Sequence, residues 1–265
     1  MITLTTDFGL SDAFVGTMKG VILSLARQAE IVDICHSVPA QNIVVGALLL
    51  EEAYGYFPPG TIHVAVVDPG VGSSRAALAI QTERYTFVGP DNGIFDLVLQ
   101  RERIIKCFEL SNPQFHRSPV SATFHGRDIF APAAAYIENG TPLEMFGPAK
   151  QRRASLILPQ PLPNAAGLEI HVLRLDHFGN LITDLTQEQY ERWNERRRVI
   201  KFTTGSVGSA RTIHGLWSTF TDVPQGEPVA YFGSGGRLEI AVHCGRASDV
   251  LQLRIGSALQ VSFAD

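Results

Sequence analysis

The stretch that most constrains the fold runs from residue 61 to residue 75 and reads TIHVAVVDPGVGSSR. It begins with an apolar run, Ile62 to Val67, which is rich in β-branched residues and therefore predicts a buried strand of a parallel sheet. Asp68 follows at the carboxyl end of this strand, before a glycine-containing loop that allows a ligand to approach the backbone. The pattern predicts a binding crevice that Arg75 can reach. An aspartate that caps the loop beside a surface arginine is the alternative.

Strand and helix patterns alternate along the first 60 residues. Met1 to Thr6 and Ile31 to Cys35 are typical of strands. Each is followed by apolar residues at helical spacing, in Phe14 to Leu25 and in Ile43 to Phe57. This β-α-β-α-β order favours a parallel sheet with helices on its faces, so we expect an N-terminal, Rossmann-like α/β domain.

Shorter strands and helices are predicted for the rest of the first domain, and the amino-acid composition changes after it. The segment 147–167 is rich in proline and poor in helix formers, which predicts a domain boundary. We therefore expect an α/β domain over residues 1–155 and a second domain over residues 168–265. The further elements predicted for the first domain are the strands Ala77 to Gln81, Tyr85 to Val88 and Ile104 to Leu110, the helices Ile94 to Leu99 and Ile129 to Glu138, and a polar loop at 123–128.

The second domain shows short alternating runs separated by turn residues, which predicts a small β-barrel or sandwich. One helical segment, Gln187 to Arg196, interrupts the strands. The predicted strands are Glu169 to Leu175, Val199 to Phe202, Val229 to Phe232, Leu238 to Val242, Val250 to Arg254 and Leu259 to Phe263.

Composition and charge exclude several classes of protein. Hydrophobic residues make up 45% and charged residues 18% of the 265 residues, and the net charge is −4, so neither nucleic acid nor a membrane surface is an expected partner. The three cysteines have no CxxC spacing, which fits a reducing cytoplasm. The chain starts with a strand-like segment rather than a signal peptide, and we expect a cytoplasmic protein.

Polar side chains follow several of the predicted strands, and their positions predict a single functional site at one edge of the sheet. Asp7, Asp68, Asn92 and His125 all come at or after the ends of such elements, and the carboxyl ends of parallel strands gather at one edge of a sheet. A carboxylate, an imidazole and the Arg75 guanidinium can together position and activate a water molecule. Turn-forming aspartates and a hydrogen-bonded loop histidine remain the alternative.

Motifs for common cofactors are absent from the sequence. There is no GxGxxG after the first strand, no GxxxxGK[ST] and no GxSxG, so dinucleotide, P-loop and nucleophile-elbow chemistry have no support. His116 and His125 have no partner at the spacing of zinc ligands. We therefore expect neither a cofactor nor a metal.

A second polar loop, Asp176 to Asn180, breaks a strand of the second domain. Phe178 offers an aromatic face between the carboxylate of Asp176 and the amide of Asn180, a combination that suits a planar heterocycle such as a purine. A plain turn with Phe178 in the core is the competing interpretation.

Six ordered motifs resemble one family, the S-adenosyl-L-methionine (SAM) hydroxide adenosyltransferases or SAM hydrolases, which are related to fluorinase and chlorinase. The resemblance runs nearly from end to end, although Gln41 stands where the family more often has an aromatic residue. The motifs are LTTDFG at 4–9, VVDPGVGSSR at 66–75, GPDNG at 89–93, FHGRDIF at 124–130, DHFGN at 176–180 and RLEIAV at 237–242.

The resemblance implies an α/β domain followed by a β-barrel, and a reaction in which water attacks C5′ of SAM to give adenosine and L-methionine. It also implies a homotrimer whose sites lie where the N-terminal domain of one subunit meets the C-terminal domain of its neighbour. Residues matched by motif would activate the water, namely Asp68, Arg75 and His125. Further matched residues would bind the substrate: Asp7 (on the ribose hydroxyls), Phe8, Asn92, Asp176, Phe178, Asn180, Ser234, Glu239 and Ala241.

Two other functions fit the same scaffold. A halogenase would transfer the adenosyl group to halide and form a 5′-halo nucleoside, but halogenating relatives lack an Asp-Arg-His set such as Asp68, Arg75 and His125. A non-catalytic SAM or adenosine sensor would bind its ligand and leave it intact, and it would have no need of that set. Attack by water is therefore the favoured prediction.

Overall fold

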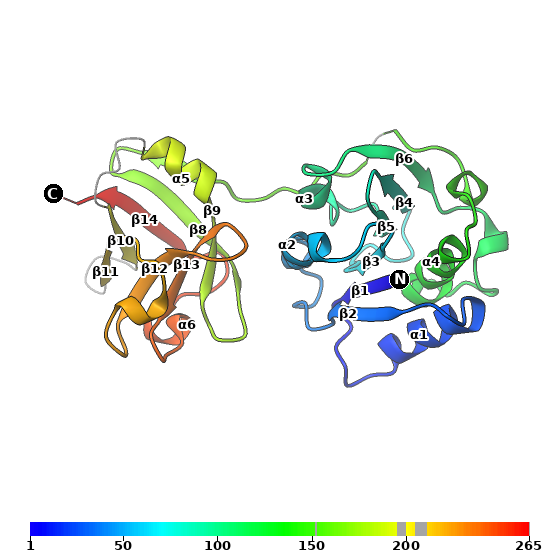
Figure 1. Cartoon of the computed structure of the whole chain (residues 1–265), viewed down its shortest axis with the longest axis horizontal. Helices are drawn as coiled ribbons and strands as arrows, with labels where there is room; N and C mark the ends of the chain where they lie inside the picture. Colours follow the sequence, from blue (N-terminus) through cyan, green and yellow to red (C-terminus); the bar gives the residue numbers. More distant parts are fainter. Residues whose placement is uncertain (152, 195–199, 205–210, 265) are drawn as a thin grey trace. The chain divides into compact units, whose positions relative to one another are not determined.

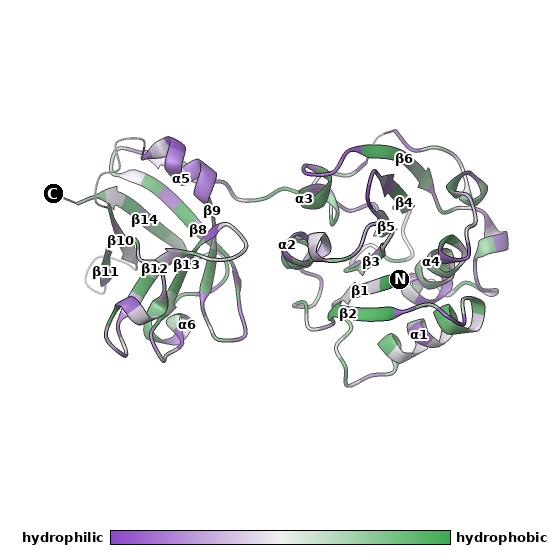
Figure 2. Cartoon of the chain, viewed as in Figure 1, coloured by the Kyte–Doolittle hydropathy of each residue, from purple (hydrophilic) through white to green (hydrophobic). Residues whose placement is uncertain are grey.

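The computed structural model describes residues 1–151, 153–194, 200–204 and 211–264 (Figure 1). The chain divides into two compact units, residues 1–157 and residues 158–265. Hydrophobic residues concentrate in the strands of each unit (Figure 2).

A six-stranded sheet forms the centre of the first unit, in the order β2-β1-β3-β5-β4-β6. Strands β1, β2, β3 and β5 are parallel, as predicted, whereas β4 pairs antiparallel with both β5 and β6. The sheet is therefore mixed, because β4 and β5 are joined by a tight turn that reverses the chain. The strands are β1 (Ile2–Thr6), β2 (Ile31–Cys35), β3 (Ile62–Val66), β4 (Ala77–Thr82), β5 (Thr86–Pro90) and β6 (Ile104–Glu109).

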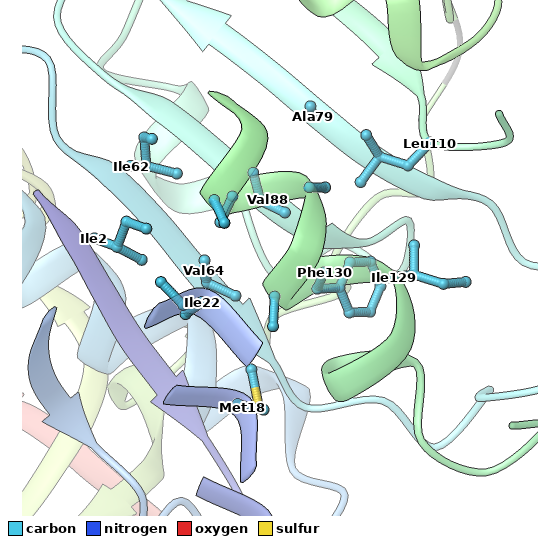
Figure 3. Packing of buried hydrophobic residues seen from close by; sticks show 14 of the residues in the cluster. Ile2, Met18, Ile22, Ile62, Val64, Ala79, Val88, Leu110, Ile129 and Phe130 are labelled. Carbon is cyan, nitrogen blue, oxygen red and sulfur yellow. The ribbon is translucent and has the colours of Figure 1, made fainter. Parts of the chain in front are cut away.

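Helices cover both faces of this sheet (Figure 1). On one face α1 (Phe14–Leu25) and α4 (Ala131–Glu138) bury a continuous core against β1 and β3, which includes Met18, Ile22 and Val64 (Figure 3). On the other face lie α2 (Ile43–Ala53) and the short α3 (Asp96–Leu99), which contact each other. Burial of these apolar side chains is the main force that stabilises the unit.

Several predicted boundaries in this unit shift by one or two residues, such as the start of α3 at Asp96 rather than Ile94, and two predictions differ further from the structure. The helix expected over Ile43 to Phe57 ends at Ala53 and is followed by a 3₁₀ turn, Tyr54–Tyr56. The segment expected as a polar loop at 123–128 instead enters a π-helix, Gly126–Phe130, which leads directly into α4. Such π-helical turns are frequent at functional sites.

The second unit is an antiparallel sheet in the order β11-β10-β14-β8-β9-β13-β12, with β7 paired to β8. The sheet is nearly closed, because Trp217 N, just after β11, donates a hydrogen bond to Ala230 O of β12 at 2.9 Å. This confirms the predicted barrel. The strands are β7 (Leu162–Asn164), β8 (Gly167–Leu175), β9 (Leu181–Thr186), β10 (Ile200–Thr204), β11 (Arg211–His214), β12 (Pro228–Phe232), β13 (Arg237–Val242) and β14 (Ala258–Phe263).

The strand predicted at Val250 to Arg254 is wrong, because this segment contains the end of α6 (Ala247–Val250) and a turn. Leu251 and Leu253 are buried in the barrel core without strand pairing. The predicted helix after β9 is α5 (Gln187–Trp193); the residues at its predicted end, Arg196, and at the predicted start of the next strand, Val199, lie outside the described residues. No described helix is both long and apolar enough to span a bilayer.

Candidate active site

The first unit gathers its polar residues at the carboxyl ends of β1 and β3. These two strands are adjacent and parallel, with Thr6 paired to Val66. Asp7 and Asp68 therefore follow neighbouring strand ends at one edge of the sheet, as the sequence predicts. This edge is where ligands bind in open α/β sheets.

Arg75 and Asp68 form a largely buried ion pair. Arg75 Nε donates to Asp68 Oδ1 at 2.9 Å and to Oδ2 at 3.0 Å, while Nη2 also donates to Oδ2. The two side chains are only 10% and 5% exposed, so water screens their attraction weakly. The guanidinium also lies over the ring of Phe130, with 5.3 Å between its central carbon and the ring centroid.

His125 completes this cluster and its protonation state follows from its partner. Arg75 Nη2 lies 2.9 Å from His125 Nδ1. Arginine can only donate hydrogen bonds, so Nδ1 must accept and the imidazole must be neutral with its proton on Nε2. Burial and the positive charge of Arg75 both lower the pKa of His125 below its ordinary value, which maintains the neutral form at neutral pH.

The loop after β3 is docked against the segment that carries His125. Gly72 has a φ of +78°, and a Cβ at this position would lie 2.4 Å from the carbonyl oxygen of Ala122. Only glycine allows both this backbone conformation and this close approach. The contact holds the loop of Arg75 beside His125.

Asp128 is fully buried and anchors the start of the π-helix. Its carboxylate accepts hydrogen bonds from the side chains of Arg127 and Arg117 and from the backbone N–H of Ser121. Burial alone would raise the pKa of Asp128, but these hydrogen bonds outweigh it and lower the pKa below its ordinary value. Asp128 therefore supports the segment around His125 rather than facing a ligand.

Asp7 lies in a turn that is held by the segment after β2. Its Oδ2 accepts a hydrogen bond at 2.8 Å from the backbone N–H of Gln41, which has a φ of +64°. Phe8, next in the chain, packs against Phe14 and Phe124 with ring centroids 5.9 and 5.8 Å away. Gln41 thus contributes to the site through its backbone N–H.

Asn92 has a supporting role in the described contacts. Its Nδ2 donates to the carbonyl of Val67 at 2.8 Å, and its Oδ1 accepts from the N–H of Ile94 at 3.2 Å. The side chain thereby fixes the residue that precedes Asp68. Asn92 therefore lies close to the site, and both ends of its amide already form hydrogen bonds within the protein.

In the second unit Asp176 and Asn180 form a closed turn. Asp176 Oδ1 accepts from the backbone N–H of Asn180, and Oδ2 accepts from Asn180 Nδ2, both at 2.8 Å. This arrangement turns the Asn180 amide so that its oxygen can accept a hydrogen bond from a ligand. Phe178, between them, is 70% exposed, so the alternative that it fills the core is wrong.

The remaining predicted residues lie on or before β13. Ser234 is exposed, and Ala241 is buried. Glu239 pairs across the strands with Tyr231, and its carboxylate occupies the space where a Cβ on Gly233 would lie, 1.9 Å from Oε1. Burial and the nearby charge of Glu239 both raise the pKa of Tyr231, so this phenol stays protonated.

Sequence reasoning missed two buried residues behind Asp7. Thr6 and His36 are 0% and 4% exposed and their side chains contact each other. Their spacing of 30 residues carries no motif. Within the described ranges no group of three or more His, Cys, Asp or Glu side chains is arranged to hold a metal ion.

Comparison with known proteins identifies relatives of the whole chain. Residues 2–147 match the SAM hydroxide adenosyltransferase N-terminal domain, and residues 170–260 match the C-terminal domain of the same family. An (R)-S-adenosyl-L-methionine hydrolase from Salinispora arenicola is 39% identical over 264 residues, which cover 98% of this chain and 97% of that protein. A fluorinase from Actinopolyspora mzabensis is 25% identical over 292 residues, with 99% and 97% coverage. The crystal structure of an uncharacterized conserved protein from Thermotoga maritima superposes with a TM-score of 0.89 at 34% identity and covers 99% of this chain and 100% of that one.

Proposed function

The chain belongs to the SAM hydroxide adenosyltransferase family, and from this premise we propose that it hydrolyses SAM to adenosine and L-methionine by attack of water on C5′. The (R) epimer at sulfur is the substrate, in line with the names of the hydrolases it resembles. The observation that carries the proposal is the simultaneous bonding of Arg75 to Asp68 and His125. A sulfonium is already a good leaving group, so the enzyme has mainly to align the water and remove its solvation.

The three clustered residues have different roles in the proposed reaction. Asp68, which has free lone pairs beyond those that Arg75 uses, accepts the proton that the attacking water loses. His125 donates from Nε2–H and orients that water, since its Nδ1 is already occupied by Arg75. As the C5′–O bond forms, the C5′–S bond breaks and its electron pair returns to sulfur, which leaves neutral methionine thioether. The proton then passes from Asp68 to solvent.

Substrate binding is assigned to residues of both units. Asp7 accepts hydrogen bonds from the ribose hydroxyls beside Phe8, and Asn92 contributes to substrate binding by supporting the chain before Asp68 through its hydrogen bond to Val67. In the second unit Phe178 stacks on the adenine ring while Asn180, oriented by Asp176, accepts from its amino group. Ser234 and the β13 segment from Glu239 to Ala241 contact the rest of the substrate.

We also propose a cytoplasmic homotrimer in which each site combines the first unit of one subunit with the second unit of its neighbour. The support is the exposure of Phe178 at 70% and of Leu10, in the Asp7 loop, at 73%, because exposed apolar side chains at a binding site are expected to be covered in the assembly. Light scattering of the purified protein gives the mass directly, and a monomer would contradict the proposal.

The reaction is tested by incubating the protein with each SAM epimer in ¹⁸O-labelled water and measuring the nucleoside by mass spectrometry. We expect labelled adenosine from the (R) epimer and its loss in Arg75→Ala. Arg84→Ala is the matched control, because Arg84 makes a similar pair with the buried carboxylate of Glu102 but follows the opposite end of β4 from Arg75. Arg84→Ala should therefore lose stability and retain labelled product.

Two outcomes would contradict the proposed reaction. Formation of a 5′-chloro nucleoside when chloride is added would indicate a halogenase. Bound but intact SAM, with the same affinity in wild type and in Arg75→Ala, would indicate a sensor.

A further inference from the structure

A chain of side-chain contacts leads from the Asp7 turn to the protein surface. Thr6 Oγ1 accepts a hydrogen bond from the backbone N–H of Phe8 at 3.2 Å and lies 2.8 Å from His36 Nδ1. His36 Nε2 in turn lies 3.0 Å from Asp33 Oδ1, and Asp33 Oδ2 lies 2.6 Å from the ammonium of Lys19. The contacts join β1, β2 and α1 behind the proposed ribose site.

The main chain of the same segment also holds this turn. The carbonyl of His36 accepts a hydrogen bond from the N–H of Gly9 at 2.7 Å. Asp7 Oδ2 accepts from Gln41 N at 2.8 Å. Residues 36–41 therefore hold the turn of residues 7–9 at Gly9 and at the Asp7 carboxylate, which limits the positions that carboxylate can take.

The charges around His36 select its tautomer. Nε2 faces the Asp33 carboxylate, which favours a proton on that nitrogen even though the two groups are poorly aligned for a hydrogen bond. Nδ1 is then the acceptor, so Thr6 donates its hydroxyl proton to His36 and keeps its lone pairs for the Phe8 N–H. Lys19 holds Asp33 in its charged form through their ion pair. This assignment of protons pairs the Thr6 hydroxyl with both His36 Nδ1 and the Phe8 N–H, and it leaves the Nε2 proton facing Asp33 without a well-aligned hydrogen bond.

We propose that Thr6 and His36 are positioning residues for SAM hydrolysis, which hold the Asp7 carboxylate in the geometry that binds the ribose hydroxyls. The proposal rests on the proposed function, since it takes the ribose as the ligand of Asp7. Neither residue reaches the ligand itself, because Thr6 is 0% and His36 4% exposed. Their effect should therefore appear in nucleoside affinity and only through Asp7.

β1 offers a matched pair of variants to test this. Thr6→Val removes the hydroxyl and keeps the shape. Thr5→Val makes the same change at the preceding residue, which is equally buried but whose hydroxyl has no hydrogen-bond partner among the described residues. We expect Thr6→Val to weaken adenosine binding by about three- to tenfold, the effect of one lost hydrogen bond, and to raise KM for SAM more than it changes kcat. Thr5→Val should bind as wild type does.

A double-mutant cycle with Asp7 separates positioning from general damage. In the Asp7→Ala background Thr6→Val should cause no further loss, and the Thr6→Val penalty should vanish for 2′,3′-dideoxyadenosine, which lacks both hydroxyls. His36→Asn, whose amide can replace Nδ1, should restore most of the affinity that His36→Leu loses.

Several results would overturn the inference. Unchanged adenosine affinity in Thr6→Val, or penalties that multiply in the Thr6→Val/Asp7→Ala double variant, would show that Thr6 does not act through Asp7. A wild-type protein that binds adenosine but does not convert SAM would contradict the proposed function alone, and the binding cycle would still decide the inference. A wild type that binds neither adenosine nor SAM would overturn both.

Discussion

At the scale of single residues, the Arg75 side chain, which can only donate hydrogen bonds, determines the protonation state of its partners in the candidate site. Because the Arg75 guanidinium cannot accept a hydrogen bond, its contact with His125 exists only while that imidazole is neutral. The same guanidinium neutralises Asp68 within a nearly buried pair. One arginine thus fixes both the tautomer of the histidine and the orientation of the carboxylate.

The pH dependence of the reaction follows from this contact. Burial and the charge of Arg75 lower the pKa of His125, so the neutral imidazole persists below pH 6.5 and is lost only at more acidic pH. We expect kcat/KM to be constant through neutrality and to fall as the pH drops through a value below 6.5. A profile of kcat/KM against pH measures this in the free enzyme. An inflection at or above pH 6.5 would show that His125 is not held neutral by Arg75, and His125→Asn should remove the inflection that His125 causes from the residual activity.

A second histidine, His63, couples stability to pH without entering the site. It is fully buried, with Nδ1 2.8 Å from Thr3 Oγ1 and with its ring stacked on Phe87 at a centroid distance of 5.3 Å. Burial lowers its pKa to about 4. Between pH 6.5 and pH 4 the unfolded chain binds a proton that the folded chain does not, so the free energy of unfolding decreases by about 3 kcal/mol as the pH falls across this range.

The test replaces both buried partners at once. In Thr3→Val/His63→Phe apolar groups replace both the ionisable ring and the hydroxyl that it contacts. Such a double replacement is expected to leave the free energy of unfolding at pH 7 nearly unchanged. We expect this variant to lose less stability than wild type between pH 6.5 and pH 4, as measured by urea unfolding at each pH. Thr3→Val alone keeps His63 and should keep the acid sensitivity. Equal losses in all three proteins would mean that His63 is not the group responsible.

At the scale of elements, we expect the loop between β3 and β4 to control the assembly of the proposed catalytic cluster of Asp68, Arg75 and His125. Gly72→Ala would force an L-residue to a φ of +78° and bring its Cβ to 2.4 Å from Ala122 O. Gly60→Ala is the control, because Gly60 has a φ of +90° but no described residue beyond its chain neighbours has an atom within 4 Å of the added Cβ. Both variants bear the left-handed backbone cost of about 1–2 kcal/mol.

Only Gly72→Ala should separate the loop that carries Arg75 from the segment that carries His125. We expect it to be less stable than Gly60→Ala by roughly 1–3 kcal/mol because of the overpacked contact. It should also lower kcat/KM, since the Arg75 loop must move away from the His125 segment, whereas Gly60→Ala should keep wild-type kcat/KM. Chemical denaturation and steady-state kinetics of the two variants measure both effects. Equal kcat/KM would show that this contact does not position Arg75.

Local pattern predicts the elements best where one face and one period dominate. The run before Asp68 is apolar and β-branched, and it forms β3 as predicted. The alternation at Val250 to Arg254 also favours a strand, but there Leu251 and Leu253 lie at a turn and still pack into the barrel core. Asp7 and Asp68 were predictable because the ends of neighbouring parallel strands must meet.

The supporting residues could not be predicted, because they depend on a shift in strand register. β1 pairs Leu4 with Asp33 but Thr5 with Cys35, so an irregularity between these pairs moves the β2 chain forward by one residue. The shift accompanies the contact of His36 with Thr6. A single sequence carries no signal for such a bulge or for the contact that follows from it.

At the scale of the whole molecule each unit has its own core and its own share of the proposed site. The core of the first unit supports Asp68, Arg75 and His125, and the barrel core supports the turn of Asp176 and Asn180. The two family domains match these units separately, at residues 2–147 and 170–260. A site assembled from two subunits would therefore be built from parts that fold around different cores.

Complementation between variants tests whether sites are shared between subunits. In the proposed homotrimer we expect Arg75→Ala to inactivate the first unit and Asn180→Ala to weaken the second, so each variant by itself should have little activity. In trimers assembled at random from equal amounts of the two chains, about one quarter of the sites would join an intact first unit to an intact second unit of a neighbour. We therefore expect coexpression to restore roughly that fraction of wild-type kcat per site, with subunit mixing verified by native mass spectrometry. The pair Arg75→Ala and His125→Ala, both in the first unit, is the control and should restore nothing. If the mixed Arg75→Ala and Asn180→Ala trimers are no more active than the separate variants, each site is contained within one chain.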